Sequence, residues 1–272
     1  MTFLLARRRS PWATVILLFL ALAAVGGIYA VASGSTKAEA TAPTASTTMI
    51  EEGHQLFLEG CSSCHGMGAD GGYQSDGTVS GPSLIGVGAA AVDFQVSTGR
   101  MPLAHPGAQA RRKPPVYNEE ETAALAAFIA SLAPGPEIPT PESYDTSGLS
   151  PEELALGGQL FRANCASCHN FSGKGGALTD GKYAPSLIEA EPRHIYEAML
   201  TGPQNMPNFP DTTLRSEDKR AIIGYIEAIR DTPNNGGIDT GRLGPVTEGL
   251  VLWILGLGAL ITVAIWIGVK AK

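Results

Sequence analysis

Cysteine is scarce in this sequence of 272 residues, and strict alternation of apolar and polar residues is almost absent. All four cysteines belong to two short motifs, so none is left for a structural disulfide. Without period-two alternation an extensive β-sheet is excluded, and helices joined by loops are favoured. We therefore expect an all-α fold.

Acidic residues are missing from both ends of the chain. All 26 of them lie between residues 34 and 248, together with 14 of the 19 basic residues, which leaves this section a net charge of −12 (14 minus 26). A surface of this sign repels nucleic acid and favours a partner with a positive docking face. The alternative is that the acidity only keeps this section soluble. In either case we expect no nucleic-acid partner.

Charge is also absent from residues 249–269, GLVLWILGLGALITVAIWIGV. As a helix this run is about 31 Å long, enough to cross the hydrocarbon core of a bilayer. Trp253 and Trp266 stand near its two ends, and Lys270 and Lys272 follow on the expected cytoplasmic side. A buried core helix is rarely this apolar over such a length, so we predict a transmembrane helix.

The N-terminal segment, residues 1–33, has two interpretations. Three arginines at positions 7–9 precede an apolar run of about 20 residues, longer than the h-region of a signal peptide, which favours a retained membrane anchor. The alternative is a signal peptide cleaved after Ala30-Val31-Ala32. Both place residues 34–248 outside the cytoplasm, at the cell membrane, and both termini are cytoplasmic if the segment is retained.

The two cysteine motifs read Cys61-Ser62-Ser63-Cys64-His65 and Cys165-Ala166-Ser167-Cys168-His169. C-x-x-C-H is the attachment pattern for a c-type haem. Two thiols on one helical turn can each form a thioether with a haem vinyl group, and the histidine donates a ring nitrogen to the iron. Zinc sites and redox dithiols also use C-x-x-C, but neither requires this histidine or predicts a second copy. We expect two covalently bound haem c groups, attached at Cys61, Cys64, Cys165 and Cys168.

The two motifs are corresponding points of an internal duplication. Gly53 and Gly157 stand eight residues before the first cysteine, and Phe57 and Phe161 stand four before it, at an offset of 104 residues. Later segments align as well: residues 81–85 with 184–188, 98–102 with 201–207, and the apolar-periodic runs 123–132 with 221–230. Each copy therefore reads as a helix, the haem motif, a Gly/Pro-rich loop, a methionine loop and a closing helix.

The duplication divides the chain. We expect the first repeat to be a domain of residues 50–133 and the second a domain of residues 151–231. The proline-rich linker 134–150 joins them as a stiff, extended connection, and Ser150-Pro151 matches the N-cap and first position of a helix. Residues 34–49 and 232–248 are expected to be tethers to the two membrane segments.

The sixth coordination position decides what each haem can do. An open position allows gas binding or peroxide chemistry, whereas methionine makes the haem an electron carrier with a raised potential. Met101 and Met206 lie 36 and 37 residues after their histidines, in loops that follow Thr-Gly, and each precedes proline. We therefore predict two axial pairs, His65 with Met101 and His169 with Met206. The alternatives are that both methionines only fill the core, or that His105 binds the first iron.

Other residues are candidates for supporting roles. A backbone carbonyl at Pro82 or Pro185 could accept the second ring N–H of the iron-bound histidine. Arg100, Lys174 and the cluster Arg111–Lys113 could pair with haem propionates, although a solvated loop is the simpler interpretation of the cluster. His54 and His194 are expected at the surface or behind the ligands of the iron. Met199 is expected in the core.

The order of these features resembles class I cytochrome c, here present twice. The chain from about residue 50 to its end is similar to the dihaem cytochrome c subunits of actinobacterial menaquinol–cytochrome c reductases. The stretches that carry this resemblance are GPSLIGVG (81–88), FQVSTGRMP (94–102), RKPPV (112–116), NCASCHNFSGKGG (164–176) and AMLTGPQNMP (198–207), with the tryptophan-bearing C-terminal segment.

The resemblance implies tandem class I cytochrome c domains with a C-terminal transmembrane helix and an N-terminal hydrophobic helix. It also implies electron transfer from a Rieske iron–sulfur subunit, through both haems, to the copper centre of a cytochrome c oxidase, beside a cytochrome b subunit. The chain would then serve a proton-translocating oxidoreductase without catalytic chemistry of its own. The rival interpretations are a dihaem carrier of another oxidase or dehydrogenase, and a dihaem peroxidase.

Overall fold

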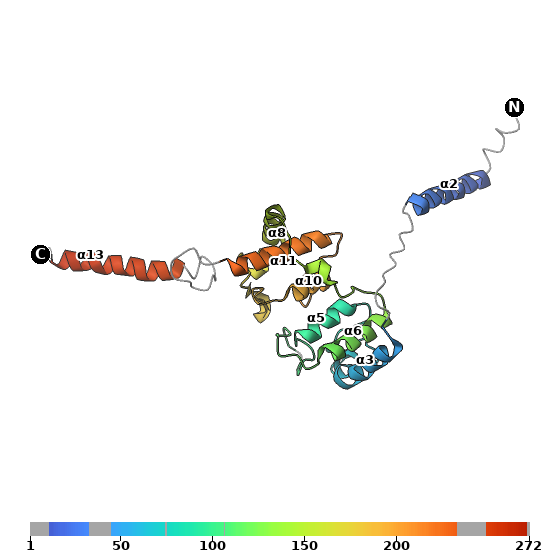
Figure 1. Cartoon of the computed structure of the whole chain (residues 1–272), viewed down its shortest axis with the longest axis horizontal. Coiled ribbons are helices and arrows are strands. Elements are labelled where there is room, and N and C mark those ends of the chain that lie inside the picture. Colours follow the sequence, from blue (N-terminus) through green and yellow to red (C-terminus); the bar gives the residue numbers. More distant parts are fainter. Residues whose placement is uncertain (1–10, 33–44, 74, 106, 233–248, 271–272) are drawn as a thin grey trace, which may run out of the picture. The chain divides into compact units, whose positions relative to one another are not determined.

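The computed structural model describes residues 11–32, 45–73, 75–105, 107–232 and 249–270. The chain divides into two units, residues 1–44 and residues 45–272. In the first, α2 (Pro11–Ala32) is the apolar N-terminal helix that the sequence predicts, drawn in blue in Figure 1. Most of the two expected tethers, the arginines at positions 7–9 and Lys272 lie outside the described residues.

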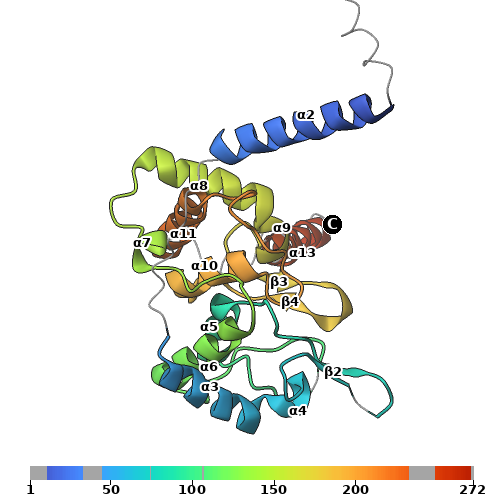
Figure 2. The ribbon, with the colours of Figure 1, turned by 90° about the vertical axis from the view of Figure 1, so that its right-hand side faces the viewer.

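Residues 45–232 contain the same order of helices twice, which confirms the tandem all-α fold. The first repeat comprises α3 (Thr47–Gly60), α4 (Ser62–His65), α5 (Ala89–Ser97) and α6 (Glu119–Leu132). The second comprises α8 (Pro151–Asn164), α9 (Ala166–His169), α10 (Pro192–Thr201) and α11 (Ser216–Asp231). In each repeat the helix before the cysteine motif packs on the closing helix, α3 on α6 and α8 on α11 (Figure 2).

A glycine lets each of these helix pairs cross closely. A Cβ atom added at Gly53 would lie 1.9 Å from the carbonyl oxygen of Ala124, and one at Gly157 would lie 2.0 Å from that of Ala221. Atoms in a close-packed interior do not approach to this distance. The duplicated glycine is therefore a requirement of the helix crossing.

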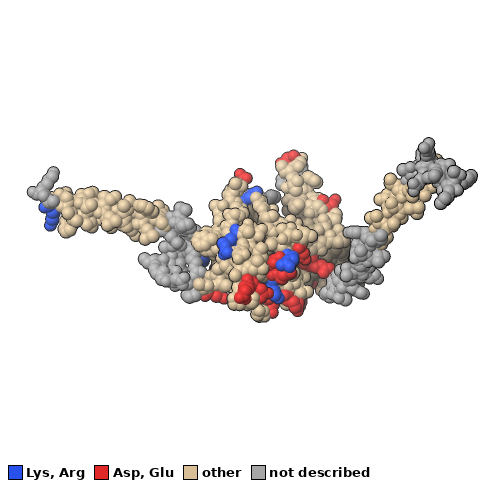
Figure 3. Space-filling model, turned by 90° about the horizontal axis from the view of Figure 1, so that it is seen from above, with Lys and Arg blue, Asp and Glu red and all other residues tan. Residues whose placement is uncertain are grey.

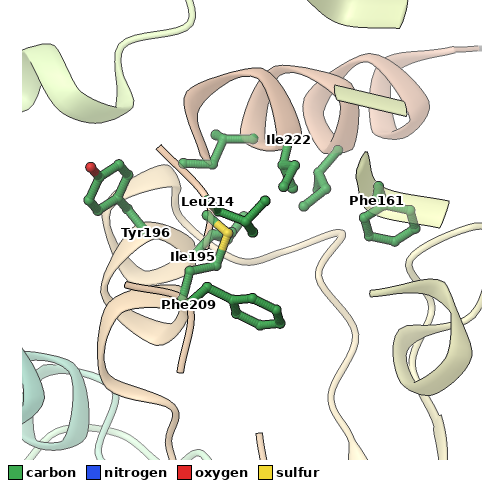
Figure 4. Packing of buried hydrophobic residues seen from close by; sticks show 9 residues of the cluster. Phe161, Ile195, Tyr196, Phe209, Leu214 and Ile222 are labelled. Carbon is green, nitrogen blue, oxygen red and sulfur yellow. The ribbon is translucent and has the colours of Figure 1, made fainter. Parts of the chain in front are cut away.

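An aromatic pair packs beside each crossing. The ring centroids of Phe57 and Phe128 are 5.3 Å apart, and those of Phe161 and Tyr225 are 5.4 Å apart. Phe57 and Phe161 are both fully buried. Figure 4 shows the core of the second repeat, to which α8, α10 and α11 each contribute apolar side chains.

The first difference from the sequence expectation is a short antiparallel ribbon in the Gly/Pro-rich loop of each repeat. The strands β1 (Gly72–Tyr73) and β2 (Val79–Gly81) pair in the first repeat, and β3 (Gly176–Ala177) and β4 (Tyr183–Ala184) pair in the second. Strands of two or three residues are too short to show alternation, so no pattern could reveal them.

A second difference is α5, which the sequence does not predict. Five of its nine residues are buried, among them Asp93. A helix enclosed on most sides shows no single apolar stripe, so its period is hidden.

Two helical features lie in the segments expected to be the first tether and the linker. Ser46 caps α3, which begins three residues inside the expected tether 34–49. The linker is interrupted by α7 (Pro141–Tyr144), because proline is well suited to the first position of a helix. The predicted cap at Ser150 is confirmed, since its side chain and that of Glu153 form a capping box at the start of α8.

The C-terminal helix, Gly249–Lys270, is long and apolar enough to cross a membrane, judged by length and composition. It contains a π-helical stretch, Leu252–Leu257, followed by α13 (Gly258–Lys270). Figure 3 shows it as an uncharged surface up to Lys270 at its C-terminal end. In α2 the apolar stretch among the described side chains is shorter, Val15–Gly27.

Candidate haem-attachment sites

Both cysteine motifs fold into the same turn at a junction of two helices. Cys61 follows α3, and its carbonyl oxygen accepts hydrogen bonds from the backbone N–H groups of Cys64 (3.1 Å) and His65 (3.0 Å). Cys165 follows α8 and accepts the equivalent bonds at 3.1 and 2.9 Å. None of the four cysteines forms a disulfide. Each turn therefore presents two thiols and one imidazole from five consecutive residues.

A backbone carbonyl orients each histidine, as the sequence predicts. The Nδ1 atom of His65 lies 2.7 Å from the carbonyl oxygen of Pro82, and that of His169 lies 2.9 Å from the carbonyl oxygen of Pro185. A carbonyl only accepts, so Nδ1 carries the proton and the lone pair of Nε2 is free for a metal. Burial lowers the pKa of His169, which keeps this ring neutral.

The surroundings of the first cysteine of each motif disfavour a thiolate. Burial, and secondarily the neighbouring cysteine, raises the pKa of Cys61 and of Cys165 to about 11. Reactive and zinc-binding cysteines are thiolates. Within the described part of the chain, no three side chains of His, Cys, Asp or Glu gather as a metal-ion site would need. The described residues thus give no support to the zinc interpretation.

In the second repeat a cavity of about 300 Å³ lies over the motif. Cys165, Cys168 and His169 line it, and so does Met206. Two thiols, a neutral imidazole with a free Nε2 and a thioether around one apolar cavity are the set that a covalent, six-coordinate haem requires. The residues present therefore fit this group.

The first repeat shows a matching arrangement. Met101 is half-buried and packs against the same core cluster as Cys61, just as Met206 packs against the same cluster as Cys165. His105 is exposed. The prediction that Met199 lies in the core is confirmed, because it is 2% exposed and belongs to the core of the second repeat.

The cavity of the second repeat has a wall that belongs to the first repeat. Its lining includes Phe94, Arg100, Gln109 and Arg112. Sequence reasoning treats the repeats as independent, so this shared wall is missed. One prediction from the sequence bears on this wall, namely that Arg100 and the Arg111–Lys113 cluster could pair with haem propionates.

Several supporting residues occupy different places from those expected. Of the two positions expected for His194, at the surface or behind the iron ligands, burial excludes the first, and its Nε2 atom lies 3.0 Å from the Ser97 hydroxyl of the first repeat. His54 stacks on Phe128 at 4.7 Å. Lys174 is not among the described residues that line the cavity, and Lys113 donates to the carbonyl oxygen of Pro102 at 2.7 Å.

Comparisons with known proteins match both repeats and nearly the whole chain. The family model described as cytochrome c matches residues 50–133, and the one described as cytochrome C oxidase, cbb3-type, subunit III matches residues 152–226. Domains of the cytochrome c type carry covalent haem c.

Three curated relatives carry the same name, cytochrome bc1 complex cytochrome c subunit. The protein of Mycobacterium tuberculosis H37Rv is 46% identical over 94% of this chain and 90% of its own length. That of Mycobacterium leprae is 46% identical over 94% and 87%, and that of Corynebacterium diphtheriae is 45% identical over 85% of each chain.

Proposed function

Because the chain belongs to the family of cytochrome bc1 complex cytochrome c subunits, we propose that it carries electrons through two haem c groups within a quinol–cytochrome c reductase. Its neighbours in the complex are a cytochrome b subunit and a Rieske iron–sulfur subunit. Electrons enter from the Rieske subunit and leave to the copper centre of a cytochrome c oxidase. The observation that carries this proposal is the duplicated site, in which each C-x-x-C-H turn has an oriented histidine and a companion methionine.

The ligand assignment follows the same geometry. Cys61 and Cys64 attach the first haem, with His65 and Met101 as axial ligands. The equivalent residues of the second repeat are Cys165, Cys168, His169 and Met206. Haem iron supplies one-electron redox chemistry when bound. The chain holds the ligands, fixes the histidine tautomer through the proline carbonyls and surrounds the site with apolar side chains that exclude water.

The domain limits and membrane arrangement complete the proposal. Residues 50–133 and 151–231 form the two haem domains, outside the cytoplasm. The C-terminal helix anchors them, and the basic residues after it lie on the cytoplasmic side. The N-terminal helix is retained as a second anchor, so both termini are cytoplasmic. A cleaved signal peptide would leave the domains on the same side.

The composition of the purified complex tests the proposal. The full chain, with a C-terminal affinity tag, is isolated from membranes in mild detergent. We expect it with a cytochrome b and a Rieske protein, with two haem c groups per chain by pyridine haemochrome assay, and with both haems reduced by a menaquinol analogue. Purification with the catalytic subunit of a haem–copper oxidase but no cytochrome b would support the alternative carrier role. A haem count below two would refute the ligand assignment.

A further inference from the structure

We infer that Arg100 and Arg112 of the first repeat bind the propionate groups of the haem held in the second repeat. The inference rests on the proposal above that the second repeat binds haem. It makes the first repeat a part of the second haem site, which is then incomplete in an isolated second domain.

The charge of the cavity lining supports this assignment. Arg100, Arg112 and Lys182 line the cavity, and no aspartate or glutamate does among the described residues. A random selection of charged residues would be mostly acidic, because residues 34–248 contain 26 acidic and only 14 basic side chains. The polar edge of a haem carries two carboxylates, which a cavity of this charge complements.

Among the described residues, no carboxylate forms an ion pair with either arginine. Ion pairs involve other arginines of the described chain, and none includes Arg100 or Arg112. Arg100 is half-buried and its guanidinium carbon lies 4.7 Å from the centroid of the Phe94 ring, which holds it at the cavity wall. A guanidinium fixed in this way can bind a carboxylate through two parallel hydrogen bonds.

Two glutamine bridges hold the arginine-bearing loop against the second repeat. The side chain of Gln109 donates to the carbonyl oxygen of Tyr183 (2.7 Å) and accepts from the same residue's N–H (2.9 Å). The side chain of Gln204 makes the same pair of bonds with the backbone of Ala110, both at 3.0 Å. Each amide side chain thus pairs with a peptide group across the contact, as in a β-ladder.

The Gln204 bridge connects the two methionine loops, whereas the Gln109 bridge joins the first of these loops to β4. Gln109 and Ala110 lie in the loop that follows Met101, and Gln204 stands two residues before Met206. The loop that carries Arg112 is therefore positioned by the same segment that supplies the proposed axial ligand of the second haem. A solvated loop would need no such connection.

Redox titration of the purified complex tests the inference. The variants are Arg100→Gln, Arg112→Gln and the double change, with Arg111→Gln as the matched control. Arg111 lies beside Arg112 and carries the same charge, but its guanidinium stacks over Tyr183 at 5.5 Å and is not among the cavity-lining residues. The Met206→Ala variant identifies the second haem, because the midpoint potential that changes in this variant belongs to it.

A cation beside the propionates favours the reduced iron, so its removal should lower the midpoint potential of the second haem. We expect the double variant to shift the electron distribution between the two haems about tenfold toward the first haem, which equals 59 mV for one electron. Arg100→Lys should recover part of the shift. The propionate bending mode of the second haem in resonance Raman spectra should also move in each single glutamine variant but not in Arg111→Gln.

Equal changes in the double variant and the Arg111→Gln control, or no change in either, would overturn the inference. If the double variant fails to assemble, the Raman comparison of Arg112→Gln with Arg111→Gln still decides, because both side chains are exposed. The haem count of the unaltered complex separates the two proposals. Fewer than two haems contradicts the proposed function, whereas two haems with unmoved propionate bands contradict only the present inference.

Discussion

Glu197 of α10 buries its carboxyl group against Asp93 of α5, where the second repeat contacts the first. Glu197 is 0% exposed, and no hydrogen-bond donor among the described residues reaches either of its carboxyl oxygens. Burial, followed by the neighbouring Asp93, raises the pKa of Glu197 to about 10, while Arg193 opposes the shift and Glu191 adds to it. Arg193 Nη2 lies 3.5 Å from Asp93 Oδ2, and the raised pKa of Glu197 keeps its own carboxyl group protonated at neutral pH.

This proton makes the contact between the repeats pH-dependent. The folded chain keeps a proton that the unfolded chain releases near its ordinary pKa of 4.5. The stability that comes from Glu197 is therefore complete below about pH 4.5 and is lost as the pH rises toward 10. At pH 7 the upper limit of this loss is about 3–4 kcal/mol, because pH 7 lies about 2.5 pH units above the ordinary pKa of 4.5.

We predict that Glu197→Gln removes this dependence. The melting temperature of the variant, measured as its difference from the unaltered protein, should increase from pH 5 to pH 9. Groups that titrate in both proteins contribute equally to both melting temperatures, so their contributions cancel in this difference. A difference that stays constant over the range would show that Glu197 ionises normally in the fold.

Gly157→Ala should destabilise the second repeat by about 1–3 kcal/mol, despite the better helix propensity of alanine. The added methyl group meets the backbone oxygen of Ala221, which cannot move without separating α8 from α11. Thermal unfolding followed by circular dichroism measures the loss. Gln159→Ala, at an exposed position of α8, is the control and should change stability by less than about 0.5 kcal/mol. Equal effects of both changes would contradict the close crossing.

The double change Cys165→Ser and Cys168→Ser should remove one haem and leave the other. Covalent attachment requires these thiols, and the two repeats attach their haems separately. Intact mass and pyridine haemochrome assay should both report one haem per chain. The control is Ser167→Ala, within the same turn, which should retain two. Retention of two covalent haems by the cysteine variant would refute the attachment site.

The C-terminal helix should suffice as an anchor. Replacement of residues 1–33 by a cleavable signal peptide is predicted to leave the protein in the membrane fraction after a carbonate wash. A further truncation after Glu248 should release it with both haems attached. Release of the first variant would show that Gly249–Lys270 does not span the bilayer.

The parts of the fold that can be predicted from the sequence are those that depend on the spacing of residues close together in the chain. The turn of each C-x-x-C-H motif and the histidine bonds to Pro82 and Pro185 occur in both repeats, and the cap at Ser150 follows from the residues next to it. Duplication makes such signals visible, because two copies of one pattern seldom agree by chance.

The contact between the repeats leaves no such signal. Ser97 and His194 meet across a surface, and so do Ala110 and Gln204, yet neither pair has a counterpart at a constant offset. For the same reason the sequence leaves two positions open for His194, at the surface or behind the iron ligands, and the structure shows that it is buried. Contacts that occur once, between residues about a hundred positions apart, must be seen in the structure.

Carbon monoxide binding to the reduced protein tests the double His/Met coordination most directly. Two filled iron sites leave no position for the gas, so the unaltered protein should give no carbon monoxide difference spectrum. Met101→Ala and Met206→Ala should each bind one equivalent, at different haems. Binding of carbon monoxide by the unaltered protein, or its absence in either methionine variant, would contradict the account.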